Sequence, residues 1–205
     1  MNALSVRTAV GALALAAGVA HAQFSLSNYT LQARYALPAV EALEASAITY
    51  NPVTDTLFVL GDEGDGVVEV SKTGALLNFM ALTGFDDTES LTHVGGGRFV
   101  IAEERLQNAY QFTFTPGGTI DRSAMPVSDL GPTVGNIGVE GLSYDPRTGT
   151  FYGVKEKTPQ RVFSAAMDFS TASSVATVND LFAPALPVTD LSDIQVLATV
   201  PGVAG

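Results

Sequence analysis

Two stretches of the sequence align without a gap: Ser46-Ala-Ile-Thr-Tyr-Asn-Pro-Val-Thr-Asp-Thr-Leu-Phe-Val-Leu-Gly-Asp62 and Glu140-Gly-Leu-Ser-Tyr-Asp-Pro-Arg-Thr-Gly-Thr-Phe-Tyr-Gly-Val-Lys-Glu156. Each has two short apolar runs on either side of an Asn-Pro or Asp-Pro turn, which is the pattern of a β-hairpin. A third copy, one residue shorter, runs from Glu89 to Glu104, and a fourth begins near Ser192. The sequence therefore predicts one strand–turn–strand unit that is used repeatedly.

The spacing of these copies predicts the architecture. They start at residues 46, 89, 140 and 192, so each period is 43 to 52 residues long. A period of this length holds about four short strands, as in the blades of a β-propeller. No stretch after the first 22 residues sustains a helical apolar period, and the strands follow one another too closely for crossover helices. We therefore expect an all-β propeller of four-stranded antiparallel blades.

The number of copies predicts an incomplete ring, with about three blades and the start of a fourth. Because radial repetition usually needs four to eight blades, residues 23–205 are interpreted as a partial β-propeller domain within a longer gene product. An unclosed arc leaves an apolar face bare, so we expect this chain to be unstable or to associate. The alternative is a complete, sandwich-like β domain.

The first 22 residues have the pattern of a signal peptide. Arg7 gives a positive start, an apolar run covers Ala9 to Ala20, and Ala20-His21-Ala22 fits the small-x-small cleavage rule. About a dozen apolar residues are few for a membrane-spanning helix. We therefore expect a secreted or periplasmic protein, with an inner-membrane anchor through an uncleaved leader as the alternative. No later segment of the sequence is predicted to cross a membrane.

Composition excludes several functions. The chain has 10 basic and 21 acidic residues, a formal net charge of −11, and such a surface repels nucleic acid and anionic lipid. It contains no cysteine, which excludes disulfides, thiol nucleophiles and thiolate metal sites. The sequence also lacks a nucleophile elbow, a zinc-protease motif and a phosphate-binding loop. His93 aligns with Tyr50 and Tyr144 and is interpreted as a residue that packs between blades.

Acidic residues recur at both ends of the repeat. Because the first two strands of a blade run antiparallel, the start of the first lies beside the end of the second. The expected neighbours are Ser46 with Asp62, Glu89 with Glu104, and Glu140 with Glu156. Two residues earlier, on the same face of an extended strand, are Glu44, Asp87 and Asp190. These carboxylates are expected to gather at one mouth of the central channel.

Carboxylate oxygens without cysteine or clustered histidine suit a hard cation, so we expect Ca²⁺ first and Mg²⁺ second. The candidate ligands are Glu89, Glu104, Glu140, Glu156, Asp87 and Glu44. The alternative is a ring of hydrated carboxylates without metal, some of them paired with Arg105, Lys155 or Lys157. Like charges that face one another on a sheet need either a cation, a proton or water between them.

Four segments resemble a known family: Glu44-Ala-Ser-Ala-Ile-Thr-Tyr-Asn-Pro, Arg98-Phe-Val-Ile-Ala-Glu-Glu-Arg105, Val139-Glu-Gly-Leu-Ser-Tyr-Asp-Pro and Val154-Lys-Glu. They look like the SdiA-regulated (YjiK/CarP-like) propellers, from about Tyr29 to Ile194. This resemblance implies a secreted or membrane-anchored propeller, related in fold to calcium-dependent phytases. Members of that family run further at the C-terminus.

Three functions remain open. The resemblance implies a calcium-binding propeller that binds an unknown small-molecule or protein ligand or carries a signal. The second possibility is a phytase-like phosphoric-ester hydrolase, in which cations at the channel mouth hold phosphate and activate water. Few basic residues are present to neutralise such a substrate, and fold analogy alone is weak support for chemistry. The third is an interaction scaffold without metal, and no catalytic residue is assigned.

Overall fold

The structure is a computed structural model, which describes residues 29–63, 65–182 and 188–197. Fourteen strands are assigned in these ranges, together with a single turn of 3-10 helix at Arg122–Ala124 and no α-helix. The all-β prediction is therefore confirmed. The predicted signal peptide, residues 1–22, lies outside the described residues. Within them, no helix has the length and apolar character needed to cross a membrane.

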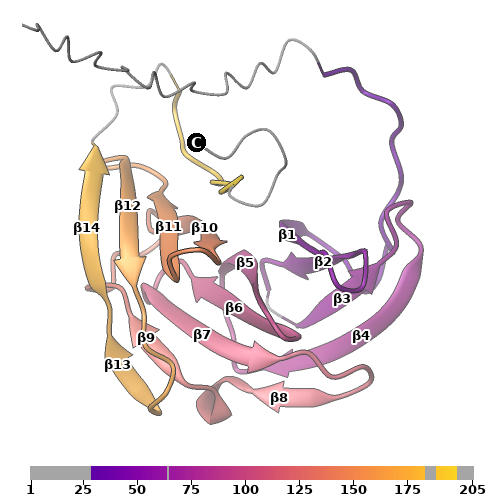
Figure 1. Cartoon of the computed structure of the whole chain (residues 1–205), viewed down its shortest axis with the longest axis horizontal. Helices are drawn as coiled ribbons and strands as arrows, with labels where there is room; N and C mark the ends of the chain where they lie inside the picture. The colour runs from indigo at the N-terminus through magenta and orange to yellow at the C-terminus, as the bar shows by residue number, and fades with distance from the viewer. Residues whose placement is uncertain (1–28, 64, 183–187, 198–205) are drawn as a thin grey trace, which may run out of the picture.

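The strands form three sheets that fan out from a common centre (Figure 1). Blade 1 contains β1 (Ala45–Asn51), β2 (Thr56–Gly61), β3 (Gly66–Val70) and β4 (Leu76–Thr83). Blade 2 contains β5 (Thr88–Gly95), β6 (Arg98–Glu103), β7 (Asn108–Thr113) and β9 (Val127–Asp129), and blade 3 contains β10 (Val139–Asp145), β11 (Thr150–Lys155), β12 (Arg161–Ala166) and β14 (Thr177–Phe182). The four strands of each blade are antiparallel, and the ring that β1, β5 and β10 line is not closed.

Two further strands join neighbouring blades by parallel pairing, in addition to the four antiparallel strands of each blade. β8 (Thr119–Asp121) pairs in parallel with β4, the outer strand of the preceding blade, and β13 (Ser173–Val175) does the same with β9. Each comes between the third and fourth strand of its own blade, so the chain leaves the blade and then returns. A parallel pair normally needs a long crossover connection. Here the strands of the intervening blade supply that length.

Apolar side chains fill the spaces between blades. One cluster, centred on Phe58, Phe99 and Phe112, lies between blades 1 and 2, and a second, with Leu142 and Phe163, lies between blades 2 and 3. This packing explains the alternation along the inner strands, where every second residue faces the preceding blade.

The equivalent position of blade 1 is uncovered. Leu91 of β5 and Leu142 of β10 are 4% and 3% exposed, whereas Ile48 of β1 is 50% exposed. No blade covers this part of β1 in the described residues, so an apolar side chain remains in contact with solvent. The same face of the blade carries a third, smaller cluster of Val59, Val68 and Val70, to which Ala42 contributes, and Val59 is the ladder partner of Ile48.

Residues 188–197 follow the path of a fourth inner strand, although they are not assigned as a strand. The N–H of Leu191 donates to the carbonyl of Glu156 (3.1 Å), as the N–H of Thr88 donates to that of Asp62 (2.7 Å). Likewise the N–H of Val196 donates to Ser143 Oγ at 3.0 Å. The described part of the fourth copy therefore lies beside β10 and the end of β11.

Candidate functional site

The carboxylates at the channel mouth are presented by a bulge that recurs in every blade. In β5, Thr88 pairs with Glu103 and Ser90 with Ala102, so Glu89 is an extra residue without a partner in the ladder. The same shift falls at Ser46 in β1 and at Glu140 in β10. A β-bulge bends its strand and redirects the side chain of the extra residue. Glu89 therefore has no ladder partner, although Glu104 is near enough for its charge to raise the pKa of Glu89.

Three of the predicted ligands nevertheless converge. Glu104 follows the end of β6, Glu140 is the bulged residue of β10, and Glu156 follows the end of β11. One carboxylate oxygen from each of the three lies within 4.8 Å of the others. We call this set the blade 2–3 triad. Two strand ends and one bulge, which are 16 to 52 residues apart in sequence, thus meet at the seam between two blades.

The backbone fixes the position of Glu104. Its side chain is buried, and one carboxylate oxygen accepts a hydrogen bond from the N–H of Gly138 at 2.8 Å. A Cβ atom at Gly138 would collide with the carbonyl oxygen of Glu104 and with the side chain of Gln107. Only glycine permits this close approach. Gly138, which precedes the first strand of blade 3, is therefore held against Glu104 of blade 2.

Burial and crowding change the acidity of Glu140. Its pKa is raised to about 8, chiefly because burial disfavours the charged carboxylate. A hydrogen bond shared with Glu104 and the nearby negative charges of Glu89, Glu104 and Glu156 raise this pKa further. In the absence of a cation, the triad therefore retains a proton at neutral pH.

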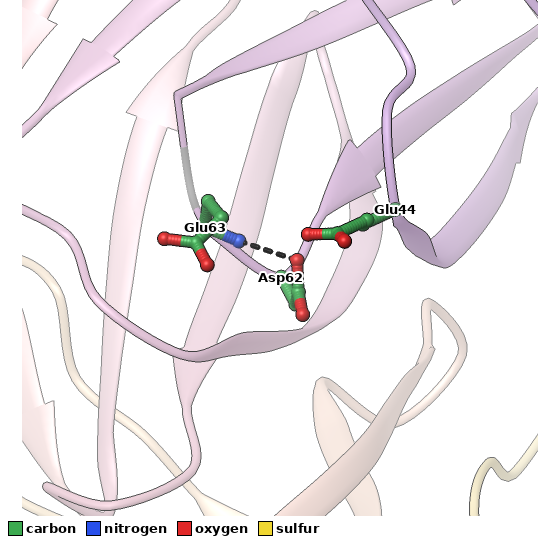
Figure 2. Close-up of side chains that lie close together, drawn as sticks. All are labelled: Glu44, Asp62 and Glu63. Carbon is green, nitrogen blue, oxygen red and sulfur yellow. Dashed lines mark hydrogen bonds between the residues drawn. The ribbon is translucent and has the colours of Figure 1, made fainter.

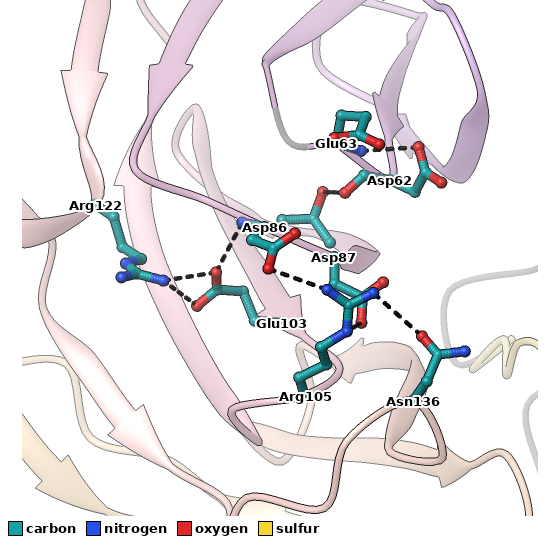
Figure 3. Close-up of polar contacts among 9 residues, drawn as sticks. Asp62, Glu63, Asp86, Asp87, Glu103, Arg105, Arg122 and Asn136 are labelled. Atoms are coloured by element: carbon teal, nitrogen blue, oxygen red, sulfur yellow. Dashed lines mark hydrogen bonds and ion pairs between the residues drawn. The ribbon is translucent and has the colours of Figure 1, made fainter.

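Asp87 and Glu89 extend the same acidic surface on the blade 2 side. Burial, followed by a hydrogen bond and repulsion from Glu104, raises the pKa of Asp87 to about 6. Burial and the charge of Asp87 raise the pKa of Glu89 to about 7, although a hydrogen bond from Ser46 opposes this shift. Figure 3 shows Arg105 between Asp86 and Asp87, and its Nε lies 2.9 Å from Asp87 Oδ2. Asp87 is therefore partly neutralised by a cation from its own blade.

Basic residues neutralise the triad only in part. Lys157 forms an ion pair with Glu156 Oε1, and its Nζ is also 3.7 Å from Asp190. The second oxygen of Glu156 is buried and has no hydrogen-bond partner among the described residues. The ammonium group of Lys155 instead donates to the backbone carbonyls of Lys157 and Thr158, so the expected pairing of Lys155 with these acids is absent from the described contacts.

Glu44 belongs to a different group. It lies with Asp62 and Glu63 on blade 1, where one oxygen from each of these residues is within 4.8 Å of the others (Figure 2). The expectation that Glu44 completes the set around Glu104 is therefore not met. Its backbone has a φ of 50°, and that of Asp87 has a φ of 66°. Such a left-handed turn ends the extended face on which these two residues were expected to lie.

The blade 2–3 triad fits a hard divalent cation. Three carboxylates offer up to six oxygens, the number from which a calcium shell begins, and carboxylate oxygen is the donor that Ca²⁺ and Mg²⁺ prefer. The buried, unpartnered oxygen of Glu156 is a ready ligand atom. The blade 1 group is more exposed than the triad.

A further acidic residue has a structural role that the sequence did not predict. Glu103 is fully buried, and both of its carboxylate oxygens accept hydrogen bonds from Arg122 Nη1, at 2.7 and 2.9 Å. One of these oxygens also accepts the N–H of Asp86 at 3.1 Å (Figure 3). Arg122 lies in the 3-10 turn between β8 and β9, so this ion pair attaches the β8–β9 connection to the end of β6 in blade 2.

With this geometry established, comparison with known proteins gives the family. The sequence matches the SdiA-regulated family over residues 21–199. The chain belongs to that family. This confirms the resemblance that the repeat segments indicated, and the match extends over nearly all of the residues that the structure describes.

A solved structure similar to this SdiA-regulated protein supports the propeller fold. A streptogramin B lyase structure has a TM-score of 0.51 at 10% identity, covering 78% of this chain and 47% of that one. Virginiamycin B lyase from Staphylococcus aureus (TM-score 0.45, 12% identity, 75% and 45% covered) and hydrazine synthase from Kuenenia stuttgartiensis (0.46, 14%, 71% and 38%) also match. The chain thus spans less than half the length of each of these proteins.

The raised pKa values predict how the stability of this SdiA-regulated protein depends on pH. Between pH 6.5 and 8.5 the folded chain binds more protons at Glu89 and Glu140 than the unfolded chain, in which both groups titrate near 4.5. The free energy of unfolding must therefore fall as the pH rises. In EDTA we expect the Tm to drop by roughly 2–4 °C across this window.

The Glu140→Gln variant provides the control for this measurement, because glutamine cannot titrate. Its Tm should change less with pH than that of the wild type. His93 opposes this trend only at the lower end of the window, because burial lowers its pKa while the imidazole of the unfolded chain still binds protons near pH 6.5. A wild-type Tm that is constant or rises between pH 6.5 and 8.5 would contradict the assignment.

Proposed function

We propose that this SdiA-regulated propeller binds Ca²⁺ at the blade 2–3 triad and has a ligand-binding or signalling role outside the cytoplasm. The observation that carries the proposal is the convergence of Glu104, Glu140 and Glu156 within 4.8 Å at the seam of two blades. Three acids in such proximity repel one another unless protons or a cation intervene. A divalent cation removes the repulsion and also supplies a partner for the buried oxygen of Glu156.

Calcium is favoured over magnesium by the shape of the site. Its ligands come from two strand ends and a bulge, which is an irregular arrangement. Ca²⁺ accepts six to eight oxygens in flexible geometry, whereas Mg²⁺ requires a near-ideal octahedron and usually retains several waters. Asp87 supplies a further carboxylate beside Glu104 and is available to complete the shell.

The proposed location and partners rest on the sequence. Residues 1–22 have the pattern of a cleaved leader, which supports a secreted or periplasmic protein. Extracellular calcium-binding modules typically bind Ca²⁺ with a Kd of about 0.1–1 mM. The protein has a net charge of −11, which repels nucleic acid. The proposed partner is therefore a small molecule or another protein.

Thermal unfolding of the full chain with and without calcium tests the metal site. After treatment with EDTA and dialysis, addition of CaCl₂ at about 100 times the Kd should stabilise the fold by about 2.7 kcal/mol through mass action. For a chain of this size we expect a rise in Tm of roughly 5–10 °C. The double variant Glu104→Gln with Glu140→Gln should abolish this rise and leave the circular-dichroism spectrum unchanged.

A matched control replaces the same number of acidic residues in the other acidic group. The double variant Glu44→Gln with Glu63→Gln leaves the triad intact and should keep the full calcium-induced rise. The proposal fails if the two double variants respond alike, or if calcium has no saturable effect on the wild type. The second result would leave hydrated carboxylates without metal, and hence a metal-free scaffold, as the better interpretation.

A phosphatase assay on the same samples tests the hydrolase alternative. With calcium present, p-nitrophenyl phosphate should be turned over at the same rate by the wild type and by the triad double variant, which is the result expected of a binding protein. Calcium-dependent turnover that the double variant loses would replace the proposed role with that of a phosphoric-ester hydrolase.

A further inference from the structure

A pocket of about 670 Å³ lies where the four inner segments end, at the opposite end of these strands from the carboxylates. All four repeats contribute to it. Equivalent positions of the repeat supply hydroxyl groups from Thr49, Thr92 and Ser143, and rings from the next positions, Tyr50, His93 and Tyr144. The C-terminal segment closes a further side through Gln195, Val196 and Leu197. A volume of this size is typical of sites for small molecules.

The lining of this pocket differs in character from the acidic mouth. None of the residues that line it has an acidic side chain, a lysine or an arginine. Proline, valine, leucine and tyrosine side chains provide most of the wall, and the polar groups are hydroxyls, one amide and one imidazole. Burial lowers the pKa of His93, so this imidazole is neutral at pH 7. A charged ligand would lose its hydration here without gaining a partner charge.

One atom in the wall lacks a partner. His93 Nε2 is buried and has no hydrogen-bond partner among the described residues. The equivalent Tyr50 is satisfied, since its hydroxyl donates to Asp55 at 2.5 Å. The ring of His93 packs against Phe99, with 5.2 Å between centroids, while its backbone N–H donates to Thr49 Oγ1. Because this nitrogen is buried, it does not face the open volume of the pocket, and the ring contributes to the wall by packing.

We propose that this pocket binds an uncharged small molecule with an aromatic or aliphatic body. The apolar walls bury the body of the ligand, and the hydroxyl groups of the lining are the polar groups near it. This site is independent of the calcium proposal, because it shares no residue with the triad. It gives the propeller two chemically distinct mouths.

Fluorescence titration of the full chain with the neutral dye prodan tests the pocket. Prodan is an aromatic ketone that only accepts hydrogen bonds, and 2-naphthol, which donates one, serves as the second probe. We expect saturable, blue-shifted prodan emission with one site per chain. The Gln195→Trp variant places an indole in the pocket from an exposed position outside any strand, and should weaken binding at least tenfold.

Two further variants test whether the dye binds elsewhere on the protein. Leu77→Ser removes an apolar side chain of the outer strand β4 that is about as exposed as Tyr50, and should leave dye binding unchanged. Tyr50→Lys introduces a charge at the rim and should weaken binding even if Gln195→Trp fails to fold. Saturable binding that survives both pocket variants would overturn the proposal. A calcium response retained in Gln195→Trp would confirm that its fold is intact.

Discussion

Replacement of Phe99 by alanine is expected to lower the free energy of unfolding by about 3–5 kcal/mol, the range for large-to-small changes of a buried phenylalanine. Phe99 is fully buried at the centre of the cluster between blades 1 and 2. Its ring lies 4.5 Å from that of Phe58, 5.2 Å from His93, 5.8 Å from Phe112 and 6.3 Å from Phe114, measured between centroids. The cavity would therefore open between two blades, where surrounding side chains from separate sheets collapse poorly.

Urea unfolding followed by circular dichroism measures this loss. Phe169→Ala is the matched control, because Phe169 is half-buried outside the strands and contacts the ring of Phe151 at 6.3 Å. Its loss should cost about 1 kcal/mol, in proportion to the smaller area that it buries. Equal losses in the two variants would show that the seam between blades 1 and 2 contributes no more than a surface contact.

The Arg122→Met variant is expected to lose about 3–5 kcal/mol, because it leaves the Glu103 carboxylate buried without a counter-charge. Glu103 is fully buried, and besides the guanidinium of Arg122 its carboxylate accepts the N–H of Asp86. Methionine preserves most of the apolar length of the arginine side chain, so the loss reports the charge. Because Arg122 directly follows β8, the variant should also weaken the pairing of β8 with β4, which joins blade 2 to blade 1.

A second substitution separates the ion pair from the uncompensated charge. In the double variant Glu103→Gln with Arg122→Met, glutamine still accepts the N–H of Asp86 but carries no charge, so much of the stability should return. Arg161→Met is the exposed comparison, since both partners of the Arg161–Asp180 pair are at least one-third exposed, and it should cost under about 1 kcal/mol. If the double variant is as unstable as Arg122→Met alone, the buried charge is not the cause of the loss.

The sequence by itself predicted the fold class, the position of the inner strands and the family. This was possible because the repeat encodes local structure: the Asn-Pro and Asp-Pro turns and the alternation around them determine a hairpin before any blade forms. The predicted copies at 46, 89 and 140 each lie within a residue of the start of an inner strand, and the fourth, at 192, lies beside β10. The acidic character of the strand ends was predictable for the same reason.

Only the tertiary structure decided which acids meet. Antiparallel pairing placed Glu89 beside Glu104, and a period of two residues placed Glu44 on the same face. A bulge in each inner strand and left-handed turns at Glu44 and Asp87 redirect these side chains. The triad forms across a seam, because Glu140 of blade 3 reaches Glu104 of blade 2 only after the blades have packed. No pattern within one repeat encodes such a contact.

Tertiary packing also decides three other features, which are the parallel strands β8 and β13, the Glu103–Arg122 pair and the uncharged pocket. β8 and β13 are three residues long, too short for an apolar alternation to be recognised, and they exist because a neighbouring blade offers a free edge. The pocket combines a few positions from each of four repeats, and only their arrangement around an axis makes them neighbours. Local sequence determines strands and turns, whereas the packing of blades determines which of their ends become a site.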